Sequence, residues 1–221
     1  MKVELLAYTK DADIICAAAG KSCYSERSSA DLLGTGDPAK SLGKIVGMGH
    51  HSVIEHAAFT FSVEGVSRAL THQLVRHRIA SFSQQSQRYV SLKDPTFVTP
   101  ETIKADPETL AVYNELMDEI WNVYSDLVEK GIPAEDARYL LPNGCTTNIT
   151  ITMNARELLH FFSSRCCERA QWEIRDMAER MLELCKEVSP TIFKDAGPPC
   201  VRGPCPEGKL SCGHPRKANK A

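Results

Sequence analysis

The sequence predicts an α+β fold in a single domain, with a mixed sheet flanked by helices. Segments with the alternating pattern of strands and segments with the 3.6-residue pattern of helices both occur along the 221 residues. Their order lacks the regular strand–helix–strand rhythm of a parallel α/β sheet. The hydrophobic content of 43% and the charged content of 24% are those of an ordinary globular protein, and the chain is long enough for one sizeable core.

The first expected strand and helix lie near the N-terminus. Residues 1–8 roughly alternate apolar and polar side chains, which predicts a short strand. Asp37 and Pro38 have the pattern of a helix N-cap followed by proline at the first helical position. Gly47 or Gly49 is expected to end this helix.

A strand followed by a helix is expected next. Residues 57–63 alternate phenylalanine and valine with threonine and serine, as a half-buried strand does. After residue 65 the spacing changes, and Val66, Leu70 and Leu74 recur every four residues, as on one face of a helix. Arg76 is therefore expected at the C-terminal end of that helix.

Further helices and a strand are expected in the C-terminal half. Residues 113–130 carry an apolar stripe and are followed by glycine, as in an amphipathic helix. Residues 146–153 are rich in β-branched side chains and predict a strand. Asn154 can cap the next helix, with Glu157 in capping-box spacing. A last stripe before Pro190 predicts a helix that packs on another helix, in this subunit or a neighbouring one. Its members are Ala170, Ile174, Met177, Met181, Leu184 and Val188.

Composition and charge exclude several classes of protein. The formal net charge of −2 argues against a general nucleic-acid binder, which would carry a basic surplus. The first residues lack the apolar run of a signal peptide, and no stretch approaches the length of a membrane span. The nine cysteines are expected as thiols rather than disulfides. We therefore expect a cytoplasmic protein without membrane or nucleic-acid partners.

Residues 76–89 are the most informative segment. They contain three arginines, one histidine, three serines and three glutamines, and no acidic side chain. The planar guanidinium of arginine suits phosphate oxygens, and hydroxyls complete such a shell, so the segment predicts a site for a phosphate-bearing ligand. Chance would match its pattern, R-H-R-x2-S-x4-S-x-R, on the order of 10⁻⁸ times per start position. The alternative is a basic, solvated helix end followed by a polar loop.

This segment resembles the signature of the flavin-dependent thymidylate synthases. Upstream, residues 49–56 read G-H-H-S-V-I-E-H and resemble the family's G-H-x-S-x-x-E-H segment. Downstream, residues 154–158, Arg165 and residues 170–174 resemble its C-terminal blocks. The matches keep their order over roughly residues 45–190, most of the chain.

The resemblance implies a reaction and an assembly. Members of this family methylate deoxyuridine monophosphate (dUMP) to thymidylate (dTMP), with 5,10-methylenetetrahydrofolate as carbon donor, and release tetrahydrofolate. FAD, recharged by NADPH, supplies the hydride. The implied α+β fold is a homotetramer with each FAD between subunits. Residues 1–195 would form the synthase domain, and residues 196–221 a Pro-, Gly- and Cys-rich tail.

The resemblance also implies residues for substrate binding and catalysis. Arg165 is the implied catalytic residue, because a guanidinium against the uracil favours loss of the N3 proton and stabilises negative charge in the ring. The alternative for Arg165 is a surface salt bridge with Glu168. The residues implied in dUMP binding are Gln73, Leu74, Val75, Arg76, Gln84, Gln85, Ser86, Gln87, Arg88, Arg138 and Arg165.

A second set of residues is implied in FAD binding. The arginines and the histidine at the start of the signature would contact the pyrophosphate and the ring. Residues 154–156 present a helix N-terminus, whose unpaired N–H groups attract anions or ring oxygens. Without the resemblance, an N-cap asparagine would be structural. The implied set is His50, Ser52, Arg76, His77, Arg78, Gln84, Asn154, Ala155, Arg156 and His160.

Two features depart from expectation or remain open. Ser83 and Gln84 stand where members of the family often have asparagine and glutamate, so Gln84 can hydrogen-bond a ligand but cannot act as a base at neutral pH. Conventional thymidylate synthases attack uracil with a cysteine thiolate, yet no cysteine lies in the signature. Cys166 and Cys167, which follow Arg165, are expected as packing side chains.

No metal site is expected. The histidines do not form H-E-x-x-H or H-x-x-E-H, and His51 and His56 are five residues apart rather than the four that a helical pair requires. The tail leaves a tetrahedral Zn²⁺ site open as an alternative to simple packing, although its cysteine gaps of four and six residues are not those of common zinc sites. The ligands would be Cys200, Cys205, Cys212 and His214.

Two other functions remain open from the sequence. One is a different nucleotide- or flavin-binding enzyme on the same scaffold. The other is a non-catalytic RNA-binding module that uses residues 76–89. The aromatic content of only 7% and the absence of a repeated base-stacking pattern argue against RNA.

Overall fold

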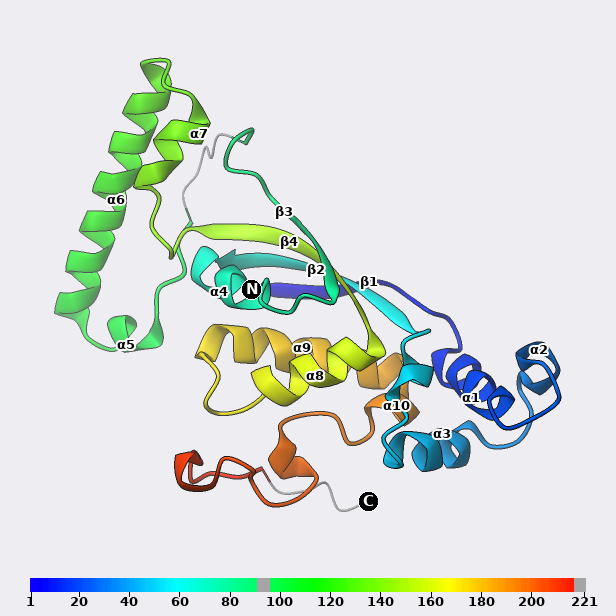
Figure 1. Cartoon of the computed structure of the whole chain (residues 1–221). Helices are drawn as coiled ribbons and strands as arrows, with labels where there is room; N and C mark the ends of the chain where they lie inside the picture. The colour runs from blue at the N-terminus through cyan, green and yellow to red at the C-terminus, as the bar shows by residue number, and fades with distance from the viewer. Residues whose placement is uncertain (91–95, 217–221) are drawn as a thin grey trace. The chain divides into compact units, whose positions relative to one another are not determined.

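The computed structural model, in which residues 1–90 and 96–216 are described, confirms an α+β fold (Figure 1). Four strands form a sheet in the order β1-β2-β4-β3. Neighbouring strands run antiparallel, so the expected mixed sheet is wrong. The strands are β1 Lys2–Tyr8, β2 Ala58–Ser67, β3 Ala80–Gln84 and β4 Thr146–Asn154.

Ten α-helices lie in the described ranges, and none of them is both long and apolar enough to cross a membrane. They are α1 Ala12–Ser22, α2 Ser29–Leu32, α3 Pro38–Gly47, α4 Arg68–Leu74, α5 Glu101–Lys104, α6 Pro107–Glu129, α7 Ala134–Ala137, α8 Ala155–Arg165, α9 Trp172–Val188 and α10 Pro190–Phe193. The short 3₁₀ helices are η1 His51–Ile54, η2 Arg138–Leu140, η3 Pro199–Val201 and η4 Gly208–Leu210.

The chain divides into two compact units, each described here by itself. Unit 1 consists of residues 1–2, 63–76 and 83–149. Unit 2 consists of residues 3–62, 77–82 and the described residues from 150 onward. The residues expected to bind the dUMP phosphate belong to unit 1, whereas Arg165 and most of those expected to bind FAD belong to unit 2.

The core of unit 2 is aromatic. Phe59 on β2 and Phe162 on α8 both pack edge-on against Phe193 on α10, with ring centroids 5.3 and 5.9 Å away, and all three rings are fully buried. Helices α8 and α9 lie side by side, and α9 also contacts α10 (Figure 1). The predicted apolar stripe is confirmed only in part: Ile174, Met177 and Met181 are buried, whereas Leu184 and Val188 are half-buried and Ala170 precedes the helix. The buried residues of α9 are Glu173, Ile174, Met177, Ala178, Met181, Leu182 and Cys185.

The helix that precedes the signature begins later than the sequence predicts. Val66 belongs to β2, and α4 begins only at Arg68. Buried Ser67 caps this helix by accepting a hydrogen bond from the Leu70 N–H at 3.0 Å. The four-residue spacing of Val66, Leu70 and Leu74 is therefore not wholly helical, although all three side chains are fully buried.

Helix α6 dominates unit 1 and begins before the predicted residue 113. Asp106 caps it by accepting a hydrogen bond from the Thr109 N–H at 3.0 Å, and Pro107 occupies the first turn. Tyr124 is buried on this helix and stacks on Trp121. Helix α6 contacts α7 and η2, and it thereby supports Arg138, the first residue of η2.

Candidate functional site

Three side chains of unit 2 form a hydrogen-bonded row. Glu157 Oε1 lies 3.1 Å from His77 Nδ1, and Arg165 Nε donates to His77 Nε2 at 3.1 Å. Glu157 and Arg165 come from the first and last turns of α8, and His77 comes from the segment before β3. Glu157 and His77 are buried, with 6% and 5% of their surface exposed. The row brings together the implied catalytic residue, an implied flavin ligand and a glutamate without an expected ligand role.

The protonation state of His77 follows from its two partners. An arginine Nε–H can only donate, so His77 Nε2 must offer its lone pair. The proton of the neutral ring is then on Nδ1, where the Glu157 carboxylate accepts it. Burial lowers the pKa of His77 below its usual value; the hydrogen bond to Glu157 opposes this, and the positive charge of Arg165 adds to it. His77 is therefore neutral at pH 7.

The N-terminus of α8 is more fully bonded than the sequence suggests. The Ala155 N–H donates to the Ala57 carbonyl at 2.8 Å, and the Glu157 N–H donates to Asn154 Oδ1 at 2.9 Å. Asn154 is thus confirmed as a cap, but the expectation of unpaired N–H groups fails at these two positions. The Glu157 carboxylate is directed to His77, because a buried imidazole N–H also needs an acceptor.

A cavity of about 1210 Å³ lies in unit 2 beside this row. Its polar lining includes three residues implied in FAD binding, namely Asn154, Arg156 and His160. The His160 ring stands 5.6 Å from the ring of His77. The apolar part of the wall includes Leu42, Val46 and Ile79. Ligand pockets are usually about 300–1,000 Å³, so the space suits a ligand as large as a dinucleotide.

Other residues of the cavity wall were not expected from the sequence. Arg156 forms an ion pair with Glu55, and Glu55, His51 and Glu157 all line the cavity. The position of Glu55 in the upstream G-H-x-S-x-x-E-H segment could have indicated it. The residues that α10 and the following turn contribute carry no motif. They are Pro190, Thr191, Ile192, Lys194, Asp195 and Ala196.

Seven residues of the implied FAD set are not part of this lining, among them Arg76, His77 and Gln84. His50 and Ser52 are exposed at and just after the start of η1, and the intervening His51 lines the cavity. Arg78 is also exposed. Ala155 is fully buried, and its N–H is bonded to Ala57, so its side chain offers no contact to a ligand.

In unit 1, Glu135 brings together two arginines implied in substrate binding. Arg88 Nε donates to Glu135 Oε2 at 2.8 Å, and Arg138 Nε donates to the Glu135 backbone carbonyl at 3.0 Å. Arg88 and Glu135 are each about half exposed. Two guanidinium groups held by one residue at the surface suit a phosphate group, whose oxygens accept charge-assisted hydrogen bonds.

The remaining substrate-set residues have varied surroundings. Gln84 ends β3, and its Nε2 donates to Thr71 Oγ1 at 3.1 Å and to Thr147 Oγ1 at 3.4 Å. A ligand must therefore use the Gln84 carbonyl oxygen or replace these bonds. Leu74 is fully buried, so only its backbone can face a ligand. Val75 and Arg76 are exposed, and Gln73, Gln85, Ser86 and Gln87 are half-buried.

Among the described residues, one group of side chains has the spacing of a metal site: His77, Glu157 and His160, with ligand atoms within 4.8 Å of one another. This group does not suit a cation. Both ring nitrogens of His77 are hydrogen-bonded, and the guanidinium of Arg165 repels positive charge. Cys200, Cys205, Cys212 and His214, the ligands considered for zinc, form no such group in the described structure, so the structure does not support that alternative.

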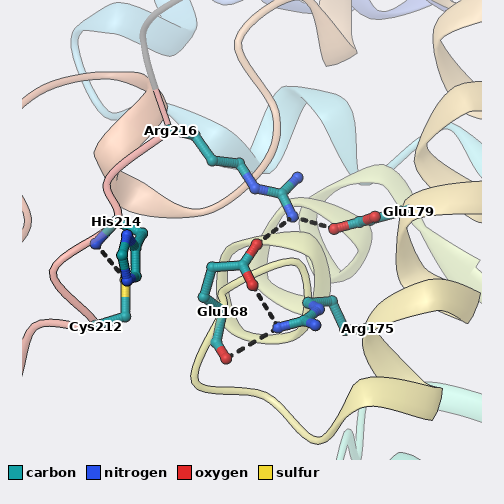
Figure 2. A network of polar contacts seen from close by, with 6 residues as sticks. All are labelled: Glu168, Arg175, Glu179, Cys212, His214 and Arg216. Carbon is teal, nitrogen blue, oxygen red and sulfur yellow. Dashed lines mark hydrogen bonds and ion pairs between the residues drawn. The ribbon is translucent and has the colours of Figure 1, made fainter. Parts of the chain in front are cut away.

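The described part of the tail is held on unit 2 by ion pairs (Figure 2). Glu168 accepts from Arg175 at 2.6 Å and from Arg216 at 3.1 Å, and Arg216 also pairs with Glu179 on α9. Separately, Arg169 pairs with Glu207 at 2.8 Å. Cys212 and His214 lie beside this network and line a second cavity of about 430 Å³.

Comparisons with known proteins bear on both units. The sequence model of the family described as "Thymidylate synthase complementing protein" matches residues 4–191. A flavin-dependent thymidylate synthase of Geobacter sulfurreducens is 52% identical over 218 residues, covering 96% of this chain and 94% of that protein. Those of Clostridium tetani and Pyrococcus furiosus are each 47% identical, over 100% and 95% of this chain and 96% and 91% of their own lengths.

Proposed function

This enzyme belongs to the flavin-dependent thymidylate synthase family, and from that premise we propose that it methylates dUMP reductively to dTMP. The carbon comes from 5,10-methylenetetrahydrofolate, and tetrahydrofolate is released. The cofactor is FAD, which NADPH reduces and which supplies the hydride. Family membership supports flavin-dependent thymidylate synthesis, and the identities of the reductant and the folate are parts of the proposal.

The observation that carries the proposal is the convergence of Asn154, Arg156 and His160 on the large cavity of unit 2. These side chains come from the α8 segment that resembles the family. Arg156 supplies positive charge for the pyrophosphate, and Asn154 and His160 supply hydrogen-bonding groups for the cofactor. Apolar side chains on the other walls suit the flavin ring. The donor set and the volume therefore fit FAD.

The residues of the substrate set have distinct proposed roles. Arg88 and Arg138 hold the phosphate of dUMP, for which their guanidinium groups are suited. Arg165 faces the uracil and stabilises the negative charge that develops when the N3 proton is lost. Its Nε is anchored on neutral His77, and the guanidinium is positively charged at any physiological pH.

The assembly and the compartment are further parts of the proposal. We place the enzyme in a homotetramer with FAD between subunits, as the resemblance implies, and light scattering would measure its mass. All nine cysteines are free thiols, which is the usual state in the reducing cytoplasm, where we place the reaction.

An anaerobic visible spectrum tests the redox cycle. The purified protein is loaded with FAD, treated with NADPH, and then given dUMP and methylenetetrahydrofolate. We expect NADPH to bleach the flavin and the oxidised spectrum to return only when both substrates are present, with dTMP identified by mass. A flavin that does not bind, or one that is reduced but indifferent to both substrates, would overturn the proposal in favour of another flavin- or nucleotide-dependent enzyme.

A further inference from the structure

The buried carboxylate of Glu157 belongs neither to the residues implied in dUMP binding nor to those implied in FAD binding. Only 6% of this residue is exposed, and a buried charged carboxylate is costly unless it is hydrogen-bonded. Its position in the first turn of α8 favours negative charge, because the helix dipole is positive there. Its Oε1 accepts from His77 at 3.1 Å.

We propose that Glu157 is a positioning residue that acts through His77 to hold the guanidinium of Arg165 in its working orientation. The inference rests on the proposed function, in which Arg165 faces the uracil. Because the Glu157 carboxylate can only accept, it keeps the His77 proton on Nδ1. This leaves the lone pair on Nε2, which accepts from Arg165 Nε. The guanidinium is planar, so fixing Nε restricts the plane of the whole group.

The surroundings of His77 make this arrangement rigid. The ring packs edge-on against buried Phe161, with centroids 5.0 Å apart and planes at 81°. The titratable and charged groups that face it are Glu157, His160 and Arg165, all on α8. One helix therefore carries both hydrogen-bonding partners of the imidazole and the aromatic ring that supports it.

Removal of the Glu157 carboxylate has a defined consequence. Without an acceptor at Nδ1, the neutral imidazole can shift its proton to Nε2. An Nε2–H would then face the Nε–H of Arg165, two donors without an acceptor, and Arg165 would be displaced. Protonation of His77 at low pH has the same effect. The rate should therefore fall as the pH decreases through the pKa of His77, which burial lowers below its ordinary value.

The test compares Glu157→Gln and Glu157→Ala with Glu183→Gln, which makes the same chemical change at an exposed position of α9. We expect kcat to fall about 10- to 100-fold in Glu157→Ala, the range seen when a hydrogen-bonding partner behind a metal ligand is lost, and to fall by less in Glu157→Gln. FAD content and the dUMP dissociation constant should change by no more than about twofold. Glutamine keeps an acceptor oxygen and the side-chain volume. The Glu157→Gln variant therefore still tests the proposal if the alanine variant does not fold.

Two readouts separate positioning from a structural role. The charge of Glu157 raises the pKa of His77, so the acid limb of the kcat profile should move to lower pH in Glu157→Gln. In addition, ¹⁵N spectra of histidine-labelled protein without substrate should show His77 protonated on Nδ1 in the wild type. An unchanged kcat with an unmoved acid limb, or an Nε2–H tautomer in the wild type, overturns the inference. A wild type that makes no dTMP refutes the proposed function, whereas the tautomer measurement still tests the His77 contacts.

Discussion

Glu135 holds the guanidinium of Arg88, the arginine proposed to bind the phosphate of dUMP. The carboxylate Oε2 lies 2.8 Å from both Nε and Nη2 of Arg88, so one oxygen accepts from two nitrogens of the guanidinium. The backbone carbonyl of Glu135 accepts from Arg138 at the same time. Because the Arg88–Glu135 ion pair is about half exposed, its contribution to stability is small, about 0–1 kcal/mol.

Glu135→Gln should therefore strengthen dUMP binding. The substitution removes a negative charge that competes with the substrate phosphate for Arg88, and it preserves the backbone carbonyl that holds Arg138. Loss of a competitor worth about 0–1 kcal/mol gives at most a fivefold lower dissociation constant for dUMP, with kcat unchanged. Equilibrium titration with dUMP measures this. Arg88→Ala should have the opposite effect, and weaker binding in Glu135→Gln would show that the carboxylate itself supports the site.

Arg165→Ala should leave the flavin bound and abolish methylation. Arg165 is absent from the lining of the large cavity of unit 2, so FAD retention depends on other residues. Its charge beside the uracil is proposed to stabilise the transition state, and loss of such a group commonly costs about 10²- to 10³-fold in kcat. Single-turnover assays with pre-reduced enzyme measure this loss.

Arg165→Lys is the matched control for that substitution. Lysine keeps the charge but lacks the planar Nε donor that His77 accepts. Its kcat should therefore lie between those of the wild type and the alanine variant. Normal turnover in Arg165→Ala would refute the assigned catalytic role.

Much of the fold could be predicted because local signals and tertiary structure agree. The cap at Asp37, the cap at Asn154 and the strand at residues 146–153 are all present, with bounds shifted by at most one residue. Each depends on side chains within a few residues of one another. The predicted start of α4 was wrong because strand β2 continues through Gly65. The φ of Gly65 is 68°, a conformation that glycine adopts readily and other residues rarely do. A buried valine at position 66 is compatible with a strand or with a helix, so apolar spacing alone could not distinguish the two.

The candidate site was only partly predictable for a different reason. Short motifs indicated His77, Arg156 and Arg165, since their residue types suit an anionic cofactor or substrate. The role of Glu157 depends on an imidazole 80 residues earlier in the chain, and spacing within α8 predicts only a capping box. Likewise, the pairing of Arg88 with Glu135 joins segments 47 residues apart. Such contacts become visible only when the chain is folded.

Cys166→Ala and Cys167→Ala should both retain turnover. Cys166 is fully buried, and burial together with the negative charge of Glu179 raises the pKa of its thiol to about 12. The thiol is therefore protonated at neutral pH and cannot attack uracil as a thiolate. Cys166→Ala should lower stability by about 1 kcal/mol through the small cavity it leaves, with kcat within about threefold of the wild type. Complete loss of activity with an intact fold would overturn the direct transfer from flavin.

Asp13→Ala should destabilise unit 2 and weaken flavin retention. From the first turn of α1, the Asp13 carboxylate accepts from the Thr191 N–H at 2.8 Å and the Ile192 N–H at 3.3 Å, and it also accepts from the Ser189 hydroxyl. These bonds fix α10, whose residues line the large cavity. Loss of several bonds to a charged acceptor should cost about 2–4 kcal/mol in the free energy of unfolding, measured by urea denaturation.

Asp37→Ala is the control for the Asp13 substitution, because Asp37 caps α3 through one bond to the Ala39 N–H at 2.9 Å. This variant should lose only about 1 kcal/mol. FAD titration should give a dissociation constant that rises in Asp13→Ala and stays nearly constant in Asp37→Ala, since only the former loosens α10. If Asp13→Ala lost no more stability than Asp37→Ala, the link between α1 and α10 would not determine the shape of the cavity wall.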